Sequence, residues 1–94
     1  MDVTVKENAD AHRYEAITDG DEVAGFVEYV DHRGTRLLFH TEVDAAALVG
    51  VGSTLAREVL DQALGNNLTL RVTCPFLKGW IERHPEYVDR VTLG

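Results

Sequence analysis

The sequence predicts an α+β fold: a mixed, mainly antiparallel sheet with helices packed on it, in the order β-β-β-α-β-α. Three observations predict it. Apolar and polar residues alternate in the first half of the chain, apolar residues then repeat at helical spacing, and alternation returns at residues 68–72. The 94 residues suffice for one domain. We therefore expect a single domain over residues 1–94, in which the polar residues 1–12, which lack a sustained period, are typical of a flexible start.

Three consecutive strands are expected before residue 44. Residues 13–18 alternate as in a half-buried strand, whereas residues 22–30 are largely apolar on both faces, as in an interior strand. A turn ending at Gly34, which can adopt positive φ, leads into residues 35–43, which are rich in β-forming residues. These strands form an antiparallel meander.

Two helices and a short strand are expected in the second half. The first helix begins at Ser53 or Thr54 and ends at Gly65-Asn66-Asn67. Its apolar face holds Leu55, Val59, Leu60, Ala63 and Leu64.

The strand at residues 68–72 is followed by Pro75, which suits the first turn of a second helix, and Pro85 ends that helix. We expect the remaining terminal piece to be anchored by Tyr87, Val88 and Val91.

Composition excludes several classes of function. Nine Lys and Arg against sixteen Asp and Glu give a formal charge of −7, which argues against a nucleic-acid partner. A single cysteine excludes an internal disulfide, and four histidines share no metal-ligand spacing, so no metal site is expected. The chain shows neither a signal peptide nor a membrane-spanning stretch, so a cytoplasmic protein without a membrane partner is expected. The oligomeric state stays open.

A glycine loop before the first helix is the strongest functional signal. Gly50 and Gly52 let the backbone approach a ligand, and the helix N-terminus favours an anion. The alternative is a tight turn that packs the helix on the sheet. A nicotinamide-binding fingerprint is disfavoured, because Leu55 stands where its third glycine would be needed.

Two further residues are candidates for chemistry. Cys74 follows a strand and precedes a helix that starts with proline, where helix N–H groups can stabilise a thiolate. The alternative for Cys74 is a small buried apolar residue. Glu42, at the end of the third strand, is a candidate catalytic carboxylate.

Four segments in order carry a family resemblance: His40-Thr41-Glu42-Val43, Gly50-Val51-Gly52-Ser53-Thr54-Leu55, Cys74-Pro75-Phe76 and His84-Pro85-Glu86-Tyr87. Together, over residues 13–91, they resemble the small single-domain branch of the GNAT N-acetyltransferase superfamily. The resemblance implies an enzyme that transfers an acetyl group from acetyl-coenzyme A (acetyl-CoA) to an amine. It also implies that the pantetheine arm lies where the strands at 37–43 and 68–72 diverge, with the pyrophosphate on the loop at 49–54.

The resemblance also implies site residues. Backbone groups near Glu42 and Val43 would hold the pantetheine and polarise the thioester, and Cys74 would take the acetyl group or line the pocket. Tyr87 would be an acid for the departing thiolate or a packing anchor. The expected cofactor contacts are Glu42, Val43, Val49, Gly50, Val51, Gly52, Ser53, Thr54, Cys74 and Phe76, and the expected catalytic residues are Cys74, Glu42 and Tyr87.

Two positions depart from the family pattern: Ala47 stands where Gln or Arg is usual, and Val51 where a basic residue is common. Because of these two departures, two other functions stay open for the protein: a non-catalytic module that binds CoA or acyl-CoA, and an interaction domain. If the protein is an enzyme, its small size favours a shallow site for a large acceptor such as a protein amine, and its charge favours a cationic one.

Overall fold

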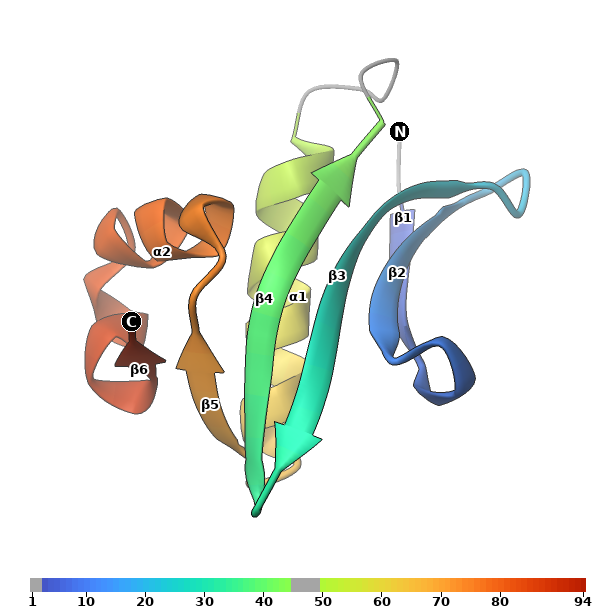
Figure 1. Ribbon diagram of the computed structural model, residues 1–94. Coiled ribbons are helices and arrows are strands. Elements are labelled where there is room, and N and C mark those ends of the chain that lie inside the picture. The colour runs from blue at the N-terminus through green and yellow to red at the C-terminus, as the bar shows by residue number, and fades with distance from the viewer. Residues whose placement is uncertain (1–2, 45–49) are drawn as a thin grey trace.

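The computed structural model describes residues 3–44 and 50–94, which form one six-stranded sheet with two α-helices (Figure 1). The elements in chain order are β1 (Val3–Asn8), the 3₁₀ turn η1 (Ala9–Ala11), β2 (Arg13–Thr18), β3 (Val23–His32), β4 (Thr35–Val43), α1 (Val51–Gly65), β5 (Thr69–Val72), α2 (Pro75–Glu82), η2 (Pro85–Arg90) and β6 (Thr92–Leu93).

The sheet is mixed, as expected, and its strands follow chain order from β1 to β6. Strands β1 to β4 form an antiparallel meander, whereas β4 pairs with β5, and β5 with β6, in parallel. The α+β prediction is confirmed. The predicted order lacked the first and last strands, which the sequence pattern did not indicate.

Residues 1–12 were expected to be a flexible start, but six of them form strand β1. It pairs with β2 from Val3↔Thr18 to Asn8↔Arg13, with Val5 buried toward the core. The side-chain amide of Gln62 on α1 donates to the Val5 carbonyl at 2.8 Å. Pairing and this bond to α1 hold a polar segment in a strand.

Helix α1 lies behind the sheet in Figure 1 and buries one face against it. It starts at Val51, earlier than the expected Ser53 or Thr54, directly after Gly50, whose left-handed conformation (φ 98°) suits glycine. Leu64, expected on the apolar face, is only partly buried. The buried residues are Val51, Leu55, Ala56, Val59, Leu60 and Ala63.

The turn before β4 and the first residue of α2 agree with the sequence. Arg33 and Gly34 both have positive φ (50° and 82°), as in a type I′ hairpin turn. Pro75 stands at the start of α2. After α2, Tyr87 is buried, but Val88 is 39% exposed and therefore does not anchor the terminal segment as expected.

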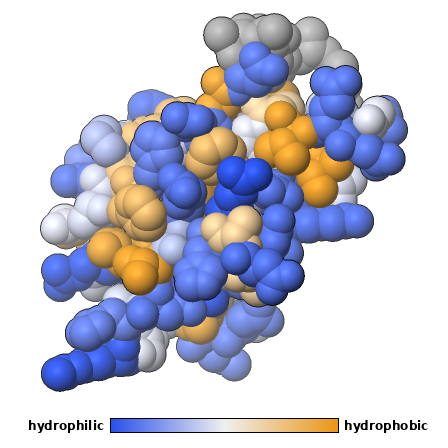
Figure 2. All heavy atoms as spheres, turned by 45° about the vertical axis from the view of Figure 1, so that its right-hand side comes forward, coloured by the Kyte–Doolittle hydropathy of each residue, from blue (hydrophilic) through white to orange (hydrophobic). Residues whose placement is uncertain are grey.

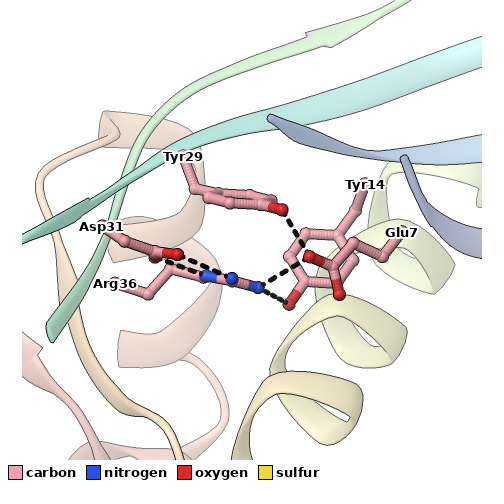
Figure 3. A network of polar contacts seen from close by, with 5 residues as sticks. All are labelled: Glu7, Tyr14, Tyr29, Asp31 and Arg36. Atoms are coloured by element: carbon pink, nitrogen blue, oxygen red, sulfur yellow. Dashed lines mark hydrogen bonds and ion pairs between the residues drawn. The ribbon is translucent and has the colours of Figure 1, made fainter. Parts of the chain in front are cut away.

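A buried arginine joins four strands of the sheet (Figure 3). The Arg36 guanidinium donates to both carboxylate oxygens of Asp31 at 2.7 and 2.9 Å, and to the Tyr14 hydroxyl at 2.8 Å. It also pairs with Glu7 at 3.1 Å and lies 3.8 Å from the centre of the Tyr29 ring, whose hydroxyl donates to Glu7. This cluster connects β1, β2, β3 and β4 at the end of the sheet where β4 also pairs with β5.

The same cluster shifts the proton affinity of its members. Burial is the largest cause that raises the pKa of Tyr14 and of Tyr29, so both hydroxyls stay protonated. The hydrogen bonds from Arg36 hold the pKa of Asp31 below its ordinary value of 3.8. Asp31 is therefore ionised, as its bidentate pairing requires.

Replacing Arg36 with Met leaves Glu7 and Asp31 without their cation. We expect Arg36→Met to lower the free energy of unfolding by roughly 2–3 kcal/mol, less than for a fully buried pair because both carboxylates are partly exposed. Urea unfolding at neutral pH measures this. The exposed Arg71 of β5 provides the matched control, Arg71→Met, with an expected change under about 0.5 kcal/mol. Equal changes would mean that the cluster does not stabilise the sheet.

The lowered pKa of Asp31 predicts a pH dependence. Its stabilising effect is fully present above the unfolded pKa of 3.8 and is lost as pH falls through the lower pKa of the folded state. We expect Asp31→Asn to lose less stability than wild type when urea unfolding is repeated at about pH 3 rather than about pH 6. Asp19→Asn, in an exposed turn, serves as the control. A pH sensitivity of Asp31→Asn as large as that of wild type would contradict the assignment.

Candidate functional site

Strands β4 and β5 run side by side for only part of their length. Their pairing extends from Thr35↔Thr69 to Leu38↔Val72, and β4 then continues to Val43 without β5 beside it. Figure 1 shows β4 rising past the end of β5 while the chain turns away into α2. Among the described residues, no strand pairs with this edge of β4 beyond Leu38, and we call it the open edge.

The residues that follow β5 explain why its pairing with β4 stops at Val72. The N–H groups of Thr73 and Cys74 both donate to the Leu38 carbonyl, at 3.1 and 3.3 Å. Pro75 follows and has no N–H to donate, so it cannot extend the ladder and instead starts α2. The divergence that the sequence predicted at residues 37–43 and 68–72 begins at Leu38 and Val72.

The β3–β4 ladder determines which backbone groups of β4 face the open edge. The Asp44 N–H donates to the Ala24 carbonyl at 2.8 Å. Hydrogen-bonded pairs alternate along antiparallel strands, so the backbone groups of Glu42 also face β3, whereas those of Thr41 and Val43 face away from it. Of the two residues expected to offer backbone contacts, Val43 therefore turns its backbone groups away from β3, whereas Glu42 turns its own toward it.

Helix α1 begins close to this edge. The Thr54 N–H makes the first helical bond, to the Gly50 carbonyl at 2.9 Å. The N–H groups of residues 51–53 have no carbonyl of their own helix to bind, and the helix dipole makes this end positive. The first turn of α1 thus has the backbone donors of an anion site.

Three residues predicted for the site meet here from three elements. A Cβ atom on Gly52 would lie 3.0 Å from the Phe76 ring and 3.7 Å from a Val43 methyl group. Phe76 and Val43 are 38% and 37% exposed. The absence of a side chain at Gly52 therefore lets two accessible apolar side chains pack closely against the first turn of α1.

Two other side chains of the loop, those of Ser53 and Val51, have structural roles. Trp80 of α2 donates its indole N–H to the Ser53 hydroxyl at 3.0 Å, which ties α2 to α1. Val51 is buried in the core, and Thr54 is exposed. Val49, also predicted as a contact, and Ala47 lie outside the described residues. Among residues 50–54, a ligand would therefore meet mainly backbone groups.

Cys74 lies where β4 and β5 separate. Its thiol is 3% exposed and donates to the Thr41 hydroxyl at 3.1 Å, bridging the start of α2 to the open part of β4. The hydroxyl is a neutral partner, unlike the cations that make thiols reactive.

Tyr87 is bound to α1 rather than to the residues around Cys74. Its hydroxyl donates to Asp61 at 2.6 Å and accepts from Arg57 at 3.2 Å, and its ring packs on Trp80. Burial, together with the bond to Asp61, raises the pKa of Tyr87. These contacts are those of the packing anchor, one of the two roles considered for it.

A cavity of about 720 Å³ lies against the paired ends of β3 and β4. It is lined by residues 23–26, residues 41–44 and Arg13. The Arg13 guanidinium lies 4.4 Å from the centre of the Phe26 ring and donates to Glu15 at 2.7 Å. Sequence reasoning singled out neither Arg13 nor Phe26, because contacts across strands leave no local signal.

Across residues 3–44 and 50–94, no group of three or more His, Cys, Asp or Glu side chains could hold a metal ion. No described helix has the length and apolar character needed to cross a membrane.

Comparison with known proteins gives the family. A family model described as "GCN5-related N-acetyl-transferase" matches residues 13–91. The solution structure of a "GCN5-like putative N-acetyltransferase" from Staphylococcus aureus is similar, with a TM-score of 0.69 and 26% identity over 97% of this chain and 88% of that one. None of the curated proteins is significantly similar. Because the family model spans most of the chain, this protein belongs to the GCN5-related N-acetyltransferases.

Proposed function

We propose that this protein transfers the acetyl group of acetyl-CoA to a primary amine. The observation that carries the proposal is the open edge of β4 beside the N-terminus of α1, in a chain that belongs to an acetyltransferase family. Family membership supports acetyl transfer in general. The donor, the acceptor and the residues involved are part of the proposal.

The geometry suits two parts of the donor, the pantetheine arm and the pyrophosphate. The outward backbone groups of Thr41 and Val43 would pair with the amides of the pantetheine arm, as an added strand pairs with a sheet edge. The N–H groups of residues 51–53 would bind the pyrophosphate. The exposed side chains of Phe76 and Val43, which pack against Gly52, would offer the ligand an apolar contact beside these groups.

The reaction is a direct transfer. The neutral amine nitrogen attacks the thioester carbonyl carbon, and a C–N bond forms while the carbonyl oxygen takes up negative charge. The C–S bond then breaks, the sulfur leaves as thiolate, and the proton lost by the nitrogen neutralises it or passes to solvent. The protein contributes by holding the two reactants together and by directing N–H groups at the oxygen.

In this mechanism Cys74 lines the acetyl site and does not carry the acetyl group. A nucleophilic cysteine is activated by a helix N-terminus, a base or a cation. Cys74 stands at the N-cap of α2, so it has the first of these features, but its side chain is not bonded to a base or a cation. The side-chain partner of Cys74 is the neutral Thr41 hydroxyl, and the thiol is almost fully buried. The structure therefore favours the second of the two roles that the sequence left open for Cys74.

The donor site is tested by a negative charge on the first turn of α1. Thr54 is exposed, and a glutamate near a helix N-terminus does not harm the helix, so Thr54→Glu should fold normally. We expect its Kd for CoA, measured by calorimetry, to rise about tenfold or more by repulsion of the pyrophosphate.

Thr54→Gln is the matched control, since it has the same shape without the charge, and its Kd should stay close to that of wild type. If wild type does not bind CoA at millimolar concentration, or if both variants bind equally well, the proposed donor site is wrong.

The role of Cys74 is tested without an acceptor. Purified protein is incubated with acetyl-CoA, and its intact mass is measured at neutral pH. We expect no acetyl adduct on Cys74, because the buried thiol has only the neutral Thr41 hydroxyl as its side-chain partner. An adduct that forms in wild type and is absent in Cys74→Ala would show that the cysteine carries the acetyl group.

A further inference from the structure

A hydroxyl other than that of Tyr87 lies where β4 and β5 separate. An acid for the departing thiolate was one of the two roles considered for Tyr87, but its hydroxyl is bound to Asp61 and Arg57 on α1. The Thr41 hydroxyl instead accepts the hydrogen bond of Cys74, beyond the last paired residue of β5. The proposed acetyl site therefore contains a hydroxyl that the sequence did not single out.

The side chain of Thr41 lies on the face of the sheet that α1 covers. A Cβ atom on Gly25 would lie 3.4 Å from a Leu55 methyl group of α1, so Gly25 faces the helix. Val27, two residues further along β3, faces the same way and is the cross-strand partner of Thr41. The opposite face, part of which Figure 2 shows, carries hydrophilic groups between its hydrophobic ones. The Thr41 side chain thus points to the covered side of the sheet, where the residue is partly buried.

The Thr41 hydroxyl has a proton to donate. A hydroxyl group carries one donor and two acceptor positions. The Cys74 thiol donates to the Thr41 oxygen at 3.1 Å and so occupies an acceptor position without using the proton. Within residues 3–44 and 50–94, the hydroxyl donates to no other group. Cys74 therefore orients the Thr41 oxygen and leaves its proton for a ligand.

Two parts of the proposed donor site determine where a bound thioester would lie. The N-terminus of α1, proposed for the pyrophosphate, is beside Val43, since a Cβ atom on Gly52 would lie 3.7 Å from a Val43 methyl group. An arm that leaves this end along the open edge meets Val43 first and then Thr41, two residues or roughly 7 Å further along β4. The open edge ends where β5 begins to pair with β4. The sulfur end of the arm would therefore lie beside the Thr41 hydroxyl and Cys74.

A hydroxyl in this place stabilises negative charge on sulfur. Hydrogen bonds to an ionised acceptor are about twice as strong as those between neutral groups, and partial burial strengthens them further. The side-chain partner of Thr41 is the neutral Cys74 thiol, so no carboxylate bound to Thr41 competes for its proton. The released thiolate would thus be the first ionised acceptor that this hydroxyl meets.

We propose that Thr41 is a catalytic residue, whose hydroxyl donates a hydrogen bond to the sulfur as the C–S bond breaks, and that Cys74 positions this hydroxyl. The sulfur takes both electrons of the C–S bond, and the Thr41 O–H bond stays intact. The proton lost by the amine nitrogen then neutralises the thiolate or passes to solvent. The proposal rests on the proposed function and names the residue that stabilises its leaving group.

The test compares two ligands that differ at the sulfur, with calorimetry under reducing conditions. At about pH 9.5 the thiol of CoA is mainly thiolate, since alkyl thiols have a pKa of about 8.5, whereas desulfo-CoA carries hydrogen in place of the thiol. Thr41→Val keeps the shape of the side chain and removes the hydroxyl. We expect it to raise the Kd of CoA about tenfold and to leave the Kd of desulfo-CoA within about twofold of wild type.

Two further variants show whether the hydroxyl itself is responsible. Thr41→Ser keeps the hydroxyl, and its Kd for CoA should stay within about threefold of wild type. Thr69→Val removes an exposed hydroxyl at the start of β5, at the paired end of the strand, and should change neither Kd. Equal weakening of CoA and desulfo-CoA in Thr41→Val would mean that Thr41 only packs against the ligand, and would overturn the proposal. An unchanged Kd for CoA in Thr41→Val would overturn it as well.

The same titrations separate this proposal from the proposed function. If wild type binds both ligands and Thr41→Val does not distinguish between them, the role of Thr41 fails and the donor site stands. If wild type binds neither ligand at millimolar concentration, the donor site is wrong and the proposed function fails with it.

Discussion

The rest of the site depends on the point at which the parallel pairing of β4 and β5 ends. The Leu38 carbonyl accepts from both Thr73 and Cys74, and Pro75 then offers no donor with which the ladder could continue. Strand β4 keeps its antiparallel partner β3 up to Val43, so it stays extended while β5 turns into α2. A sheet edge with unpaired backbone groups is the kind of surface that binds an extended ligand.

The sheet of this small domain is stabilised away from the open edge of β4. The Arg36 cluster joins β1 to β4 at the end of the sheet where β4 and β5 remain paired. Helix α1 covers one face with a buried apolar stripe and is tied to α2 through Trp80 and Ser53, and to Tyr87 through Asp61. The side chains of Ser53, Asp61 and Trp80 thus hold the helices and the segment after α2 together.

Some of the side chains that the sequence singled out for the site have structural partners in the fold. Gly50 and Gly52 were recognisable because positive φ and close approach have a strong residue preference. Ser53 and Tyr87 belong to motifs at the same place in the chain, but their hydroxyls bind Trp80 and Asp61, partners far away in sequence. Arg13 and Phe26 had no motif at all, because their contact forms across two strands.

By itself the sequence determined the meander from residue 13 to residue 43, the helix after the glycine loop, the start of α2 at Pro75 and the family, since these depend on local periodicity, turn chemistry and short motifs. Only the tertiary structure decided the rest. Strand β1 has a weak local signal and exists because β2 and Gln62 hold it. The direction of the Thr41 and Val43 backbone groups follows from the register with β3, and the cavity from the meeting of β2, β3 and β4. Such features arise from contacts between residues distant in the chain, which a pattern read along the sequence does not contain.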